Sequence, residues 1–274
     1  MTLLLAIAAG ALIGLSLGAL GGGGSVLAVP VLVYLLGQSA PQATTGSLVV
    51  VGVTSLIGAI TAHRAGNVLL GRGLVFGLVA IGGAVVGAEA SSRVSEDVLL
   101  AAFAALMLLV GGMLVWRQLR HRRGGGHRHA AKPALDDPII TFSPRFVCQC
   151  PRALKVLVTA TIVGTLTGFL GVGGGFLVVP ALLLALALPM RYAAGTSLVV
   201  ITITSAAALV VRAGSGVQPD WTPVALLTAT SAAMAIAGAR LADRADSDWL
   251  QTIFAVLIVG VAVYTATQAL PALL

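Results

Sequence analysis

The sequence predicts an all-α protein that crosses a membrane several times and is built from two similar halves. Three observations carry this prediction. Of the 274 residues, 58% are hydrophobic and only 9% are charged, with a mean hydropathy of +1.04, more apolar surface than one soluble core could bury. The apolar residues gather in runs of membrane-spanning length. Finally, one long segment occurs twice, 150 residues apart.

Eight apolar runs follow one another along the chain, and six of them fit a single crossing of roughly 20 residues. They cover approximately residues 3–36, 43–62, 73–90, 98–116, 153–188, 193–211, 222–239 and 249–269. The first run of each half is too long, because about 34 residues of helix would stretch about 51 Å, against about 30 Å of hydrocarbon. We therefore expect about eight transmembrane elements in two groups of four, with the first element of each group broken or re-entrant.

The duplication is visible residue by residue. Residues 18–51 and 168–201 align without a gap and share 15 of 34 positions, where apolar composition alone would give roughly three or four. Further on, Gly87, Arg93, Asp97 and Phe103 match Gly238, Arg244, Asp248 and Phe254 at an offset of 151. The sequence thus predicts a first transmembrane repeat over 1–116, a linker over 117–152 and a second repeat over 153–274.

The linker carries most of the positive charge. The chain has a formal net charge of +7, and nine of its 16 basic residues lie between Arg117 and Lys155. So local a cluster indicates a cytoplasmic loop under the positive-inside rule rather than a nucleic-acid site. We predict no metal site there, because the linker spaces its histidines and cysteines as HxH and CxC, unlike common zinc sites, and we expect its thiols to be reduced; the residues are His121, His127, His129, Cys148 and Cys150.

The orientation of the halves stays open. No Lys or Arg precedes Arg64, so residues 1–20 lack the basic start of a signal peptide and are expected to be a transmembrane segment. Four crossings per half would make the repeats parallel, with both termini in the cytoplasm, whereas counting each broken element as two crossings would make them inverted. The remaining charges do not settle the question. In the first half, His63, Arg64 and Arg72 favour a cytoplasmic second connection, while in the second half Arg240 and Arg244 outnumber Arg212 and mildly favour inversion.

Glycines mark the place where each long run breaks, and prolines follow. The matched glycines are Gly21, Gly23 and Gly24 and, in the second half, Gly171, Gly173 and Gly174, followed by Pro30 and Pro180. A glycine run frees backbone groups that are tolerated at membrane depth only beside protein or a watery cavity. We expect half-helices to begin near Ser25 and Phe176, with Pro30 and Pro180 in their first turns. The positive N-terminal ends of these half-helices would favour an anion. We expect the matched glycines of the two runs, together with Ser25 and Gly175, to hold it. Close helix packing is the alternative for one glycine run, but the matched pair favours a site.

A second shared motif opens the next helix of each half. Thr44-Thr45-Gly46-Ser47-Leu48 corresponds to Ala194-Gly195-Thr196-Ser197-Leu198. Hydroxyl groups at a helix start can cap the helix or donate hydrogen bonds to an oxyanion. We expect Ser47 and Ser197 to lie near the ligand, with Thr45 and Thr196 assisting.

Few charged or titratable residues fall near the apolar runs. His63 ends the second element and could carry a coupling proton. Glu89 and Arg240 occupy matching positions beside Gly87 and Gly238 and are further candidates for ion coupling. All three could instead mark the membrane boundary, where such residues are ordinary.

The doubled pattern resembles the sulfite exporter TauE/SafE family of transporters, whose halves carry a GxGGGxxxxPxL-like segment followed by a GTSL-like one. Here these are residues 21–32 with 45–48, and residues 171–182 with 195–198. The resemblance covers nearly all of the chain except the linker, and it implies sulfite, sulfonates or related small sulfur-containing anions as substrates. The first copy departs from the pattern: its hydroxyl motif has another order, and Ser25 stands where the second copy has Gly175. The halves could thus contribute unequally.

Together, these features predict a multi-pass cell-membrane protein that acts as a secondary transporter of a small sulfur-containing anion. The anion would be held at the repeat interface by the glycine breaks and the Ser and Thr hydroxyls, and its transport would be coupled to an ion gradient. No GxxxxGK[ST] segment occurs, and no cofactor is expected. The expected partners are a small anion and lipid, without nucleic acid. A passive channel is the main alternative. A membrane-embedded enzyme would need a catalytic constellation that the apolar runs do not contain.

Overall fold

The structure is a computed structural model that describes residues 2–91, 93–123, 150–170, 175–185, 188–214 and 217–242, together with 249, 250 and scattered positions from 252 to 263. Within these ranges all the regular elements are helical. In chain order they are α1 (Thr2–Leu20), α2 (Ser25–Pro30), a π-helix η1 (Val31–Leu35), α3 (Ala40–Arg64), α4 (Leu70–Ser91), α5 (Glu96–Arg123), α6 (Cys150–Leu170), α7 (Gly175–Ala185), α8 (Met190–Ala213) and α9 (Trp221–Ala242).

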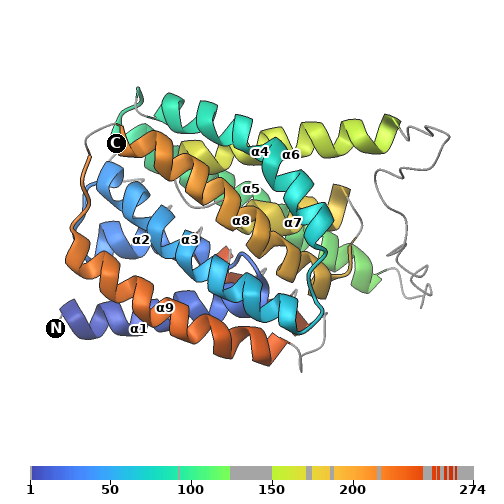
Figure 1. The fold of residues 1–274 in the computed structure, drawn as a ribbon, viewed down its shortest axis with the longest axis horizontal. Coiled ribbons are helices and arrows are strands. Elements are labelled where there is room, and N and C mark those ends of the chain that lie inside the picture. Colours follow the sequence, from blue (N-terminus) through green and yellow to red (C-terminus); the bar gives the residue numbers. More distant parts are fainter. Residues whose placement is uncertain are drawn as a thin grey trace.

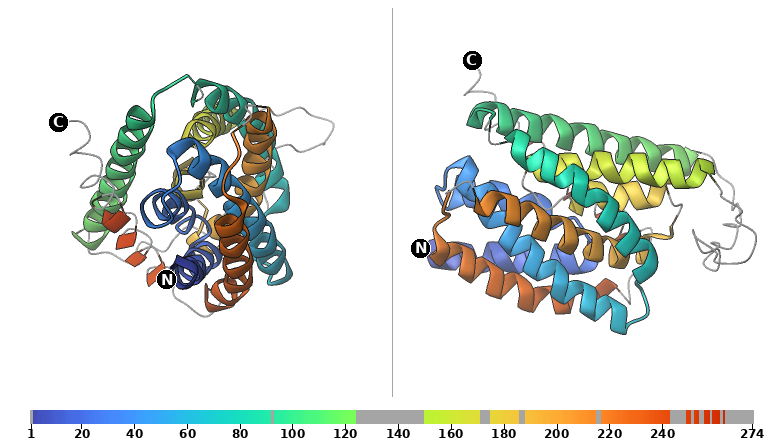
Figure 2. Two further views of the ribbon diagram at one scale, coloured as in Figure 1. Left: turned by 90° about the vertical axis from the view of Figure 1, so that its left-hand side faces the viewer. Right: turned by 45° about the horizontal axis from the view of Figure 1, so that its top comes forward.

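The helices form an elongated bundle with two distinct ends (Figure 1). We call one the linker end, because α5 finishes and α6 starts there; it also holds the junction between α3 and α4. The opposite end, the terminal end, holds the start of α1 and the junction between α8 and α9 (Figures 1 and 2).

The first long run is divided at its glycines, and the chain turns back there. Helix α1 stops at Leu20, and Gly21 has a φ of 72°, which an L side chain rarely adopts. Gly24 then packs against the carbonyl of Ile13 and the backbone of Leu17, which precede it in the chain by about three and two helical turns. Since an uninterrupted helix would carry residue 24 away from them, α2 runs back along α1. The first element of the first half is therefore re-entrant. The matching glycines of the second half, Gly171, Gly173 and Gly174, lie outside the described residues.

The prolines do not occupy the position expected of them. Pro30 is the sixth residue of α2, and Pro180 is the sixth of α7, so both lie in the second turn rather than the first. The glycines alone therefore end α1. After Pro30 the chain widens into η1, where the N–H of Leu36 reaches the carbonyl of Val31 at 3.1 Å. Together α2 and η1 span about 16 Å, about half of a bilayer core.

Two pairs of helices, each drawn from both halves, pack most closely. Helix α1 lies along α9, and α4 lies along α6. Small residues allow this approach: a β-carbon on Gly14 would overlap the carbonyl of Ser231, and one on Gly168 would overlap that of Ala84. The glycines recur every fourth position, at Gly10, Gly14 and Gly18 in α1, at Gly83 and Gly87 in α4, and at Gly164 and Gly168 in α6. This is the small-xxx-small packing of membrane helices.

Helices α3 and α8 occupy the middle of the bundle and run in opposite directions. Gly52 of α3 lies beside Ser205 of α8, whereas Gly58, further along α3, lies beside Leu198, earlier along α8. Helices α3 and α8 carry matching sequences, so these two copies of the same segment point in opposite directions along the bundle. Phe103 of α5 packs edge-on against Phe176 of α7, with ring centroids 6.4 Å apart.

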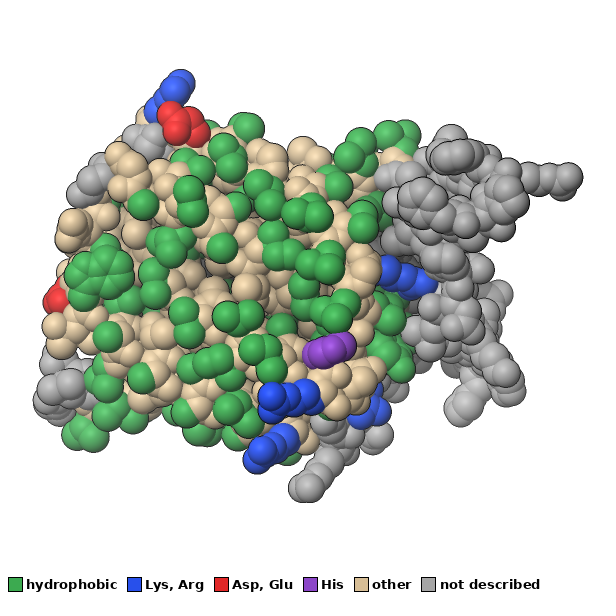
Figure 3. Space-filling model, viewed as in Figure 1, with side chains coloured by type: hydrophobic (Ala, Val, Ile, Leu, Met, Phe, Trp, Pro, Cys, Tyr) green, Lys and Arg blue, Asp and Glu red, His purple; other side chains and the backbone are tan. Residues whose placement is uncertain are grey.

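On the face drawn in Figure 3, apolar side chains cover the length of the bundle, and the charged side chains of the described residues lie toward its ends. Large apolar side chains such as Leu78, Val86 and Ile162 are more than half exposed along the sides of the helices. Helices α3, α4, α8 and α9 are each long and apolar enough to cross a membrane. The exposed apolar residues therefore form a surface suited to lipid rather than to water.

Candidate functional site

The glycine turn of the first half meets the second half in the interior of the bundle. A β-carbon on Gly22 would overlap the carbonyl of Gly175, the first residue of α7, and one on Gly21 would overlap the backbone of Ala194 in α8. Conversely, a β-carbon on Gly175 would lie only 2.9 Å from the Cα of Gly22 and 2.7 Å from the Oγ of Ser25. Glycine is thus required on both sides of this contact. The structure thus places the glycine turn of the first half against Gly175 and against Ala194, the first residue of the hydroxyl motif of the second half.

Two predicted serines fix the turn through its carbonyl groups. The Ser25 hydroxyl donates to the carbonyl of Gly22 at 2.7 Å. The Ser197 hydroxyl lies 2.7 Å from the carbonyl of Gly21 and also 2.7 Å from that of Ala194. Since a hydroxyl has one proton, it can donate to only one of these two oxygens at a time. Ser197 therefore joins α8 to the turn, and its hydroxyl can donate to either of two carbonyl acceptors.

The other predicted hydroxyls are buried but lie elsewhere along the helix starts. Ser47 donates to the carbonyl of Thr44 at 2.9 Å, and Thr45 donates to the carbonyl of Pro41 at 3.0 Å. Thr196 instead accepts a hydrogen bond of 3.1 Å from the backbone N–H of Leu69, in the connection between α3 and α4. Ser197 and Thr196 thus contact the first half, while Ser47 and Thr45 have local carbonyl acceptors.

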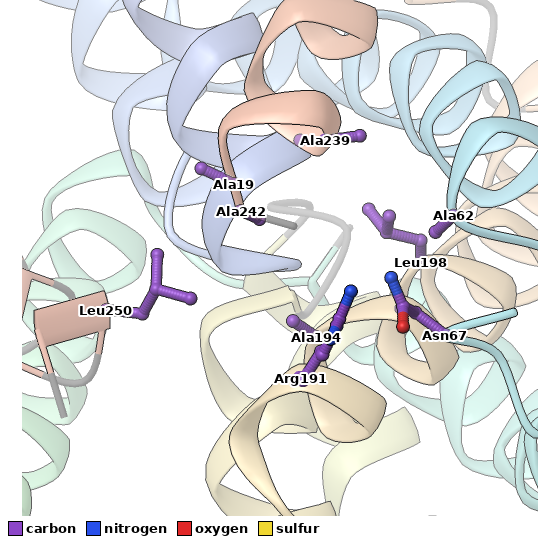
Figure 4. A pocket seen from close by; sticks show the side chains of 11 residues that line it. Ala19, Ala62, Asn67, Arg191, Ala194, Leu198, Ala239, Ala242 and Leu250 are labelled. Carbon is purple, nitrogen blue, oxygen red and sulfur yellow. The ribbon is translucent and has the colours of Figure 1, made fainter. Parts of the chain in front are cut away.

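A small cavity lies at the linker end and is lined in part by Ala194, the residue that Gly21 of the glycine turn packs against (Figure 4). Its volume is about 20 Å³, which is room for one water molecule and not for a tetrahedral or pyramidal oxyanion. Both halves line it, with Arg191 and Asn67 as its polar side chains; the remaining lining residues are Gly18, Ala19, Ala62, Ala194, Gly195, Leu198, Ala239, Ala242 and Leu250. Arg191 is exposed, so this cavity begins at a positively charged entrance.

The three candidates for ion coupling are surface residues. His63 is exposed in the last turn of α3, and Arg240 is exposed near the end of α9, both at the linker end. Glu89 is exposed near the end of α4, with its carboxylate 3.5 Å from Arg93. The structure does not bring Glu89 and Arg240 together, since they belong to opposite ends of the bundle.

Sequence reasoning missed three polar residues. Asn67 lies in the connection between α3 and α4, and Arg191 lies in the first turn of α8. Polar side chains are common at such positions, and no sequence pattern ties these two residues to the glycine turn. Arg212 looked like a boundary residue at the end of a run, but it is only 9% exposed and donates hydrogen bonds to Thr44 and Ser91. The signal for Arg212 was available, because its position in the first repeat holds an alanine.

A family model described as sulfite exporter TauE/SafE matches residues 6–265. The chain belongs to this family. It is 30% identical over 266 residues to a probable membrane transporter protein of Xylella fastidiosa strain 9a5c, covering 96% of this chain and 94% of the relative. It is 27% identical over 209 residues to the probable membrane transporter protein YunE of Bacillus subtilis, covering 74% of this chain and 72% of the relative. No solved structure gives a significant match.

Membership confirms the resemblance seen in the sequence. The family and its relatives are membrane transporters rather than enzymes, and the apolar helices agree with a multi-pass membrane protein. The glycine turn, the hydroxyls around it and the nearby cavity form the candidate site in this TauE/SafE family member.

Proposed function

We propose that this TauE/SafE family member is a secondary transporter that carries a small sulfur-containing anion, such as sulfite or a sulfonate, across the cell membrane. The observation that carries the proposal is the contact between Gly22 and Gly175, with the Ser197 hydroxyl on the Gly21 carbonyl. Broken membrane helices from two halves, meeting in the bundle interior, are the usual setting of a transport site.

The groups around the turn suit an oxyanion. If the Ser197 proton turns from either carbonyl toward a bound anion, the other hydrogen-bonding groups of the turn need not change. The Ser25 hydroxyl and the amides of the glycine turn are the neighbouring donors. The proposed binding set is completed by residues of both halves: Thr45 and Ser47 from the first, and Gly171, Gly173, Gly174 and Thr196 from the second.

The route from the linker end is also suited to an anion. Arg191 stands at the entrance, and Arg64, Arg72 and Arg240 belong to the same end of the bundle. A positive entrance raises the local concentration of anions. Since the cavity holds no more than about one water, the structure corresponds to a nearly closed state in which the anion has no passage yet.

We further propose the membrane orientation and the repeat symmetry. Counting α1, the α2–η1 segment, α3, α4 and α5 gives five elements before the linker, so the second repeat would begin from the opposite side and be inverted. The basic residues at the linker end support a cytoplasmic linker, and both ends of the chain would then face outward. Residues 1–116 and 153–274 are the two proposed repeats, and His63, beside the cavity-lining Ala62, is the first candidate for proton coupling.

The test is transport by the purified protein in proteoliposomes. Radiolabelled sulfite or a sulfonate should enter with saturable kinetics, and Ser197→Ala combined with Ser47→Ala should reduce the rate about tenfold or more, the cost of one or two hydrogen bonds to a charged ligand. Thr161→Ala is the matched control, because Thr161 also donates to a carbonyl within its own helix, α6, but is exposed and does not line the candidate site. The proposal fails if no small anion binds or crosses, or if the control loses as much activity.

A passive channel would use the same donors, and the flux distinguishes it. A coupled transporter responds to an imposed proton or sodium gradient and accumulates the anion against its own gradient. A channel only dissipates the anion gradient, and its flux does not saturate at low concentration. Accumulation of sulfite above equilibrium would support transport, whereas its absence under every ion gradient would favour the channel.

A further inference from the structure

Arg212 is a buried guanidinium near the terminal end of the bundle. It lies in the last turn of α8 and is 9% exposed. One terminal nitrogen donates to the Thr44 hydroxyl at 3.1 Å, and the other donates to the Ser91 hydroxyl at 2.7 Å and to the Gly168 carbonyl at 3.3 Å. The two hydroxyls donate onward to the carbonyls of Pro41 and Ala88. One side chain thus ties together α3, α4, α6 and α8.

The burial pattern identifies the counterpart of Arg212 in the first half. Buried positions recur along α3 and α8 at a constant offset of 150, at Val50, Val51, Thr54, Ser55 and Ala62 and at Val200, Ile201, Thr204, Ser205 and Arg212. Ala62 is therefore equivalent to Arg212. The similar tripeptides Arg64-Ala65-Gly66 and Arg212-Ala213-Gly214 suggest a different match, but Arg64 is exposed and lies on another face of its helix.

The partners of Arg212 have counterparts as well, and all of them line the cavity at the linker end. Gly168 corresponds to Gly18 and Thr44 to Ala194 at the offset of 150, and Ser91 corresponds to Ala242 at the offset of 151 that the third elements follow. Ala62 completes this set of lining residues. The same four positions thus surround a cavity at one end of the bundle and are joined by the Arg212 side chain at the other.

We propose that the space around Arg212 is the second half of a symmetric anion pathway, which Arg212 closes in this structure and in which its guanidinium binds the anion when the terminal end opens. This inference rests on the proposed transport function. A guanidinium offers paired N–H donors that match an oxyanion, and here its donors are held by hydroxyl and carbonyl oxygens that an anionic oxygen can replace. Opening that separates α8 from α4 would release the Ser91 bond first and turn the donors toward the entering anion.

The closure is tested by the reactivity of matched cysteines. In a Cys148→Ser, Cys150→Ser background, Thr44→Cys and Ala194→Cys are probed with a charged, membrane-impermeant methanethiosulfonate in intact cells and in inverted vesicles. Thr44→Cys should be protected, and adding Arg212→Ala should raise its reaction rate about tenfold or more from the terminal face, since closure worth about 1.4 kcal/mol gives tenfold. Ala194→Cys should not change. Equal rates for Thr44→Cys with and without Arg212 would overturn the closure.

A mirror substitution keeps the test decisive if Arg212→Ala does not fold. Ala62→Arg places a guanidinium at the equivalent position of the linker end, where the cavity now lies. It should slow the labelling of Ala194→Cys from the linker face about tenfold or more, by the same reasoning. An unchanged rate in this variant would show that the two positions are not equivalent.

The anion-binding role is tested by separating charge from size. Arg212→Met keeps a long side chain without charge, and Arg212→Lys keeps the charge without the paired donors. In proteoliposomes, Arg212→Met should raise the KM for sulfite added at the terminal face about tenfold, with a smaller rise for Arg212→Lys and little change for sulfite added at the linker face. Wild-type kinetics in Arg212→Met would overturn the binding role. Wild-type protein that carries no small anion would instead overturn the proposed function, while the labelling would still report the closure.

Discussion

Gly83 of α4 lies directly against the carbonyl oxygen of Thr161 in α6, and a β-carbon at Gly83 would also lie 2.7 Å from the backbone nitrogen of Thr165. The next residue back, Gly82, has no atom of the described residues within 4 Å of its own β position. Neighbouring glycines in one helix thus have opposite surroundings. Comparing an alanine substitution at each glycine therefore separates the effect of the close contact between helices from the low helix propensity of glycine.

Gly83→Ala should therefore lower stability while Gly82→Ala should not. We expect Gly83→Ala to cost about 1–3 kcal/mol, because the clashing atoms belong to a backbone that cannot turn aside. Gly82→Ala should be neutral or stabilise by up to about 1 kcal/mol through helix preference. Thermal unfolding of both variants in the same detergent measures the difference, and equal melting temperatures would contradict the packing described for α4 and α6.

The glycine turn offers a similar comparison. Gly21 and Gly37 have φ values of 72° and 67°, but a β-carbon at Gly21 would overlap the backbone of Ala194, whereas Gly37 has nothing within 4 Å. Gly37→Ala should cost only the left-handed strain of about 1–2 kcal/mol. Gly21→Ala should cost more and should abolish anion flux, because α8 is pushed off the turn. Unfolding in detergent and flux in proteoliposomes check both, and retained flux in Gly21→Ala would argue against a site at the turn.

Thr54 and Ser231 form a hydroxyl pair between α3 and α9, with 2.7 Å between their oxygens. Both side chains are fully buried. A double-mutant cycle with Thr54→Val and Ser231→Ala should give a coupling energy of about 0.6 kcal/mol and no more than about 1.7 kcal/mol, the average and the maximum for such bonds between membrane helices. A coupling energy indistinguishable from zero would mean that the two hydroxyls do not bond to each other in the membrane.

Arg191 should matter for anion entry, and Arg93 should not. Arg191→Gln removes the positive charge at the cavity and should raise the KM for sulfite about tenfold at low salt, with a smaller effect as ionic strength screens the entrance. Arg93→Gln is the matched control, since Arg93 is 77% exposed and pairs with Glu89 at the terminal end. An exposed pair of this kind contributes little. The same KM change in both variants would refute a local role for Arg191.

The position of the break in the first half was predictable, but the direction of the chain after it was not. Length arithmetic requires an interruption in residues 3–36, and Gly21 to Gly24 are the residues least able to continue a helix. A glycine run does not specify whether the next helix continues or turns back. That choice depends on Gly24 packing on Ile13 and Leu17, a contact that no local pattern announces.

Site residues were predictable where the repeat marked them and hidden where the repeat differed. Ser197 and Gly175 stood out because the first half carries matching or related residues, and the structure puts both at the turn. Arg212 was overlooked because the search favoured positions that agree between the halves. Ala62, its counterpart at the offset of 150, differs from it completely, and the burial register along α3 and α8 supports this pairing over the one with Arg64.

The close packing of α1 with α9 and of α4 with α6 has a consequence for motion. Glycine contacts at backbone distance leave no room for either helix of a pair to slide or tilt against the other. Each pair must therefore move as one rigid body, although its helices come from different halves of the chain. The unit of movement in this protein is not the unit of duplication, so a substitution in one half can stop a motion whose hinge lies in the other.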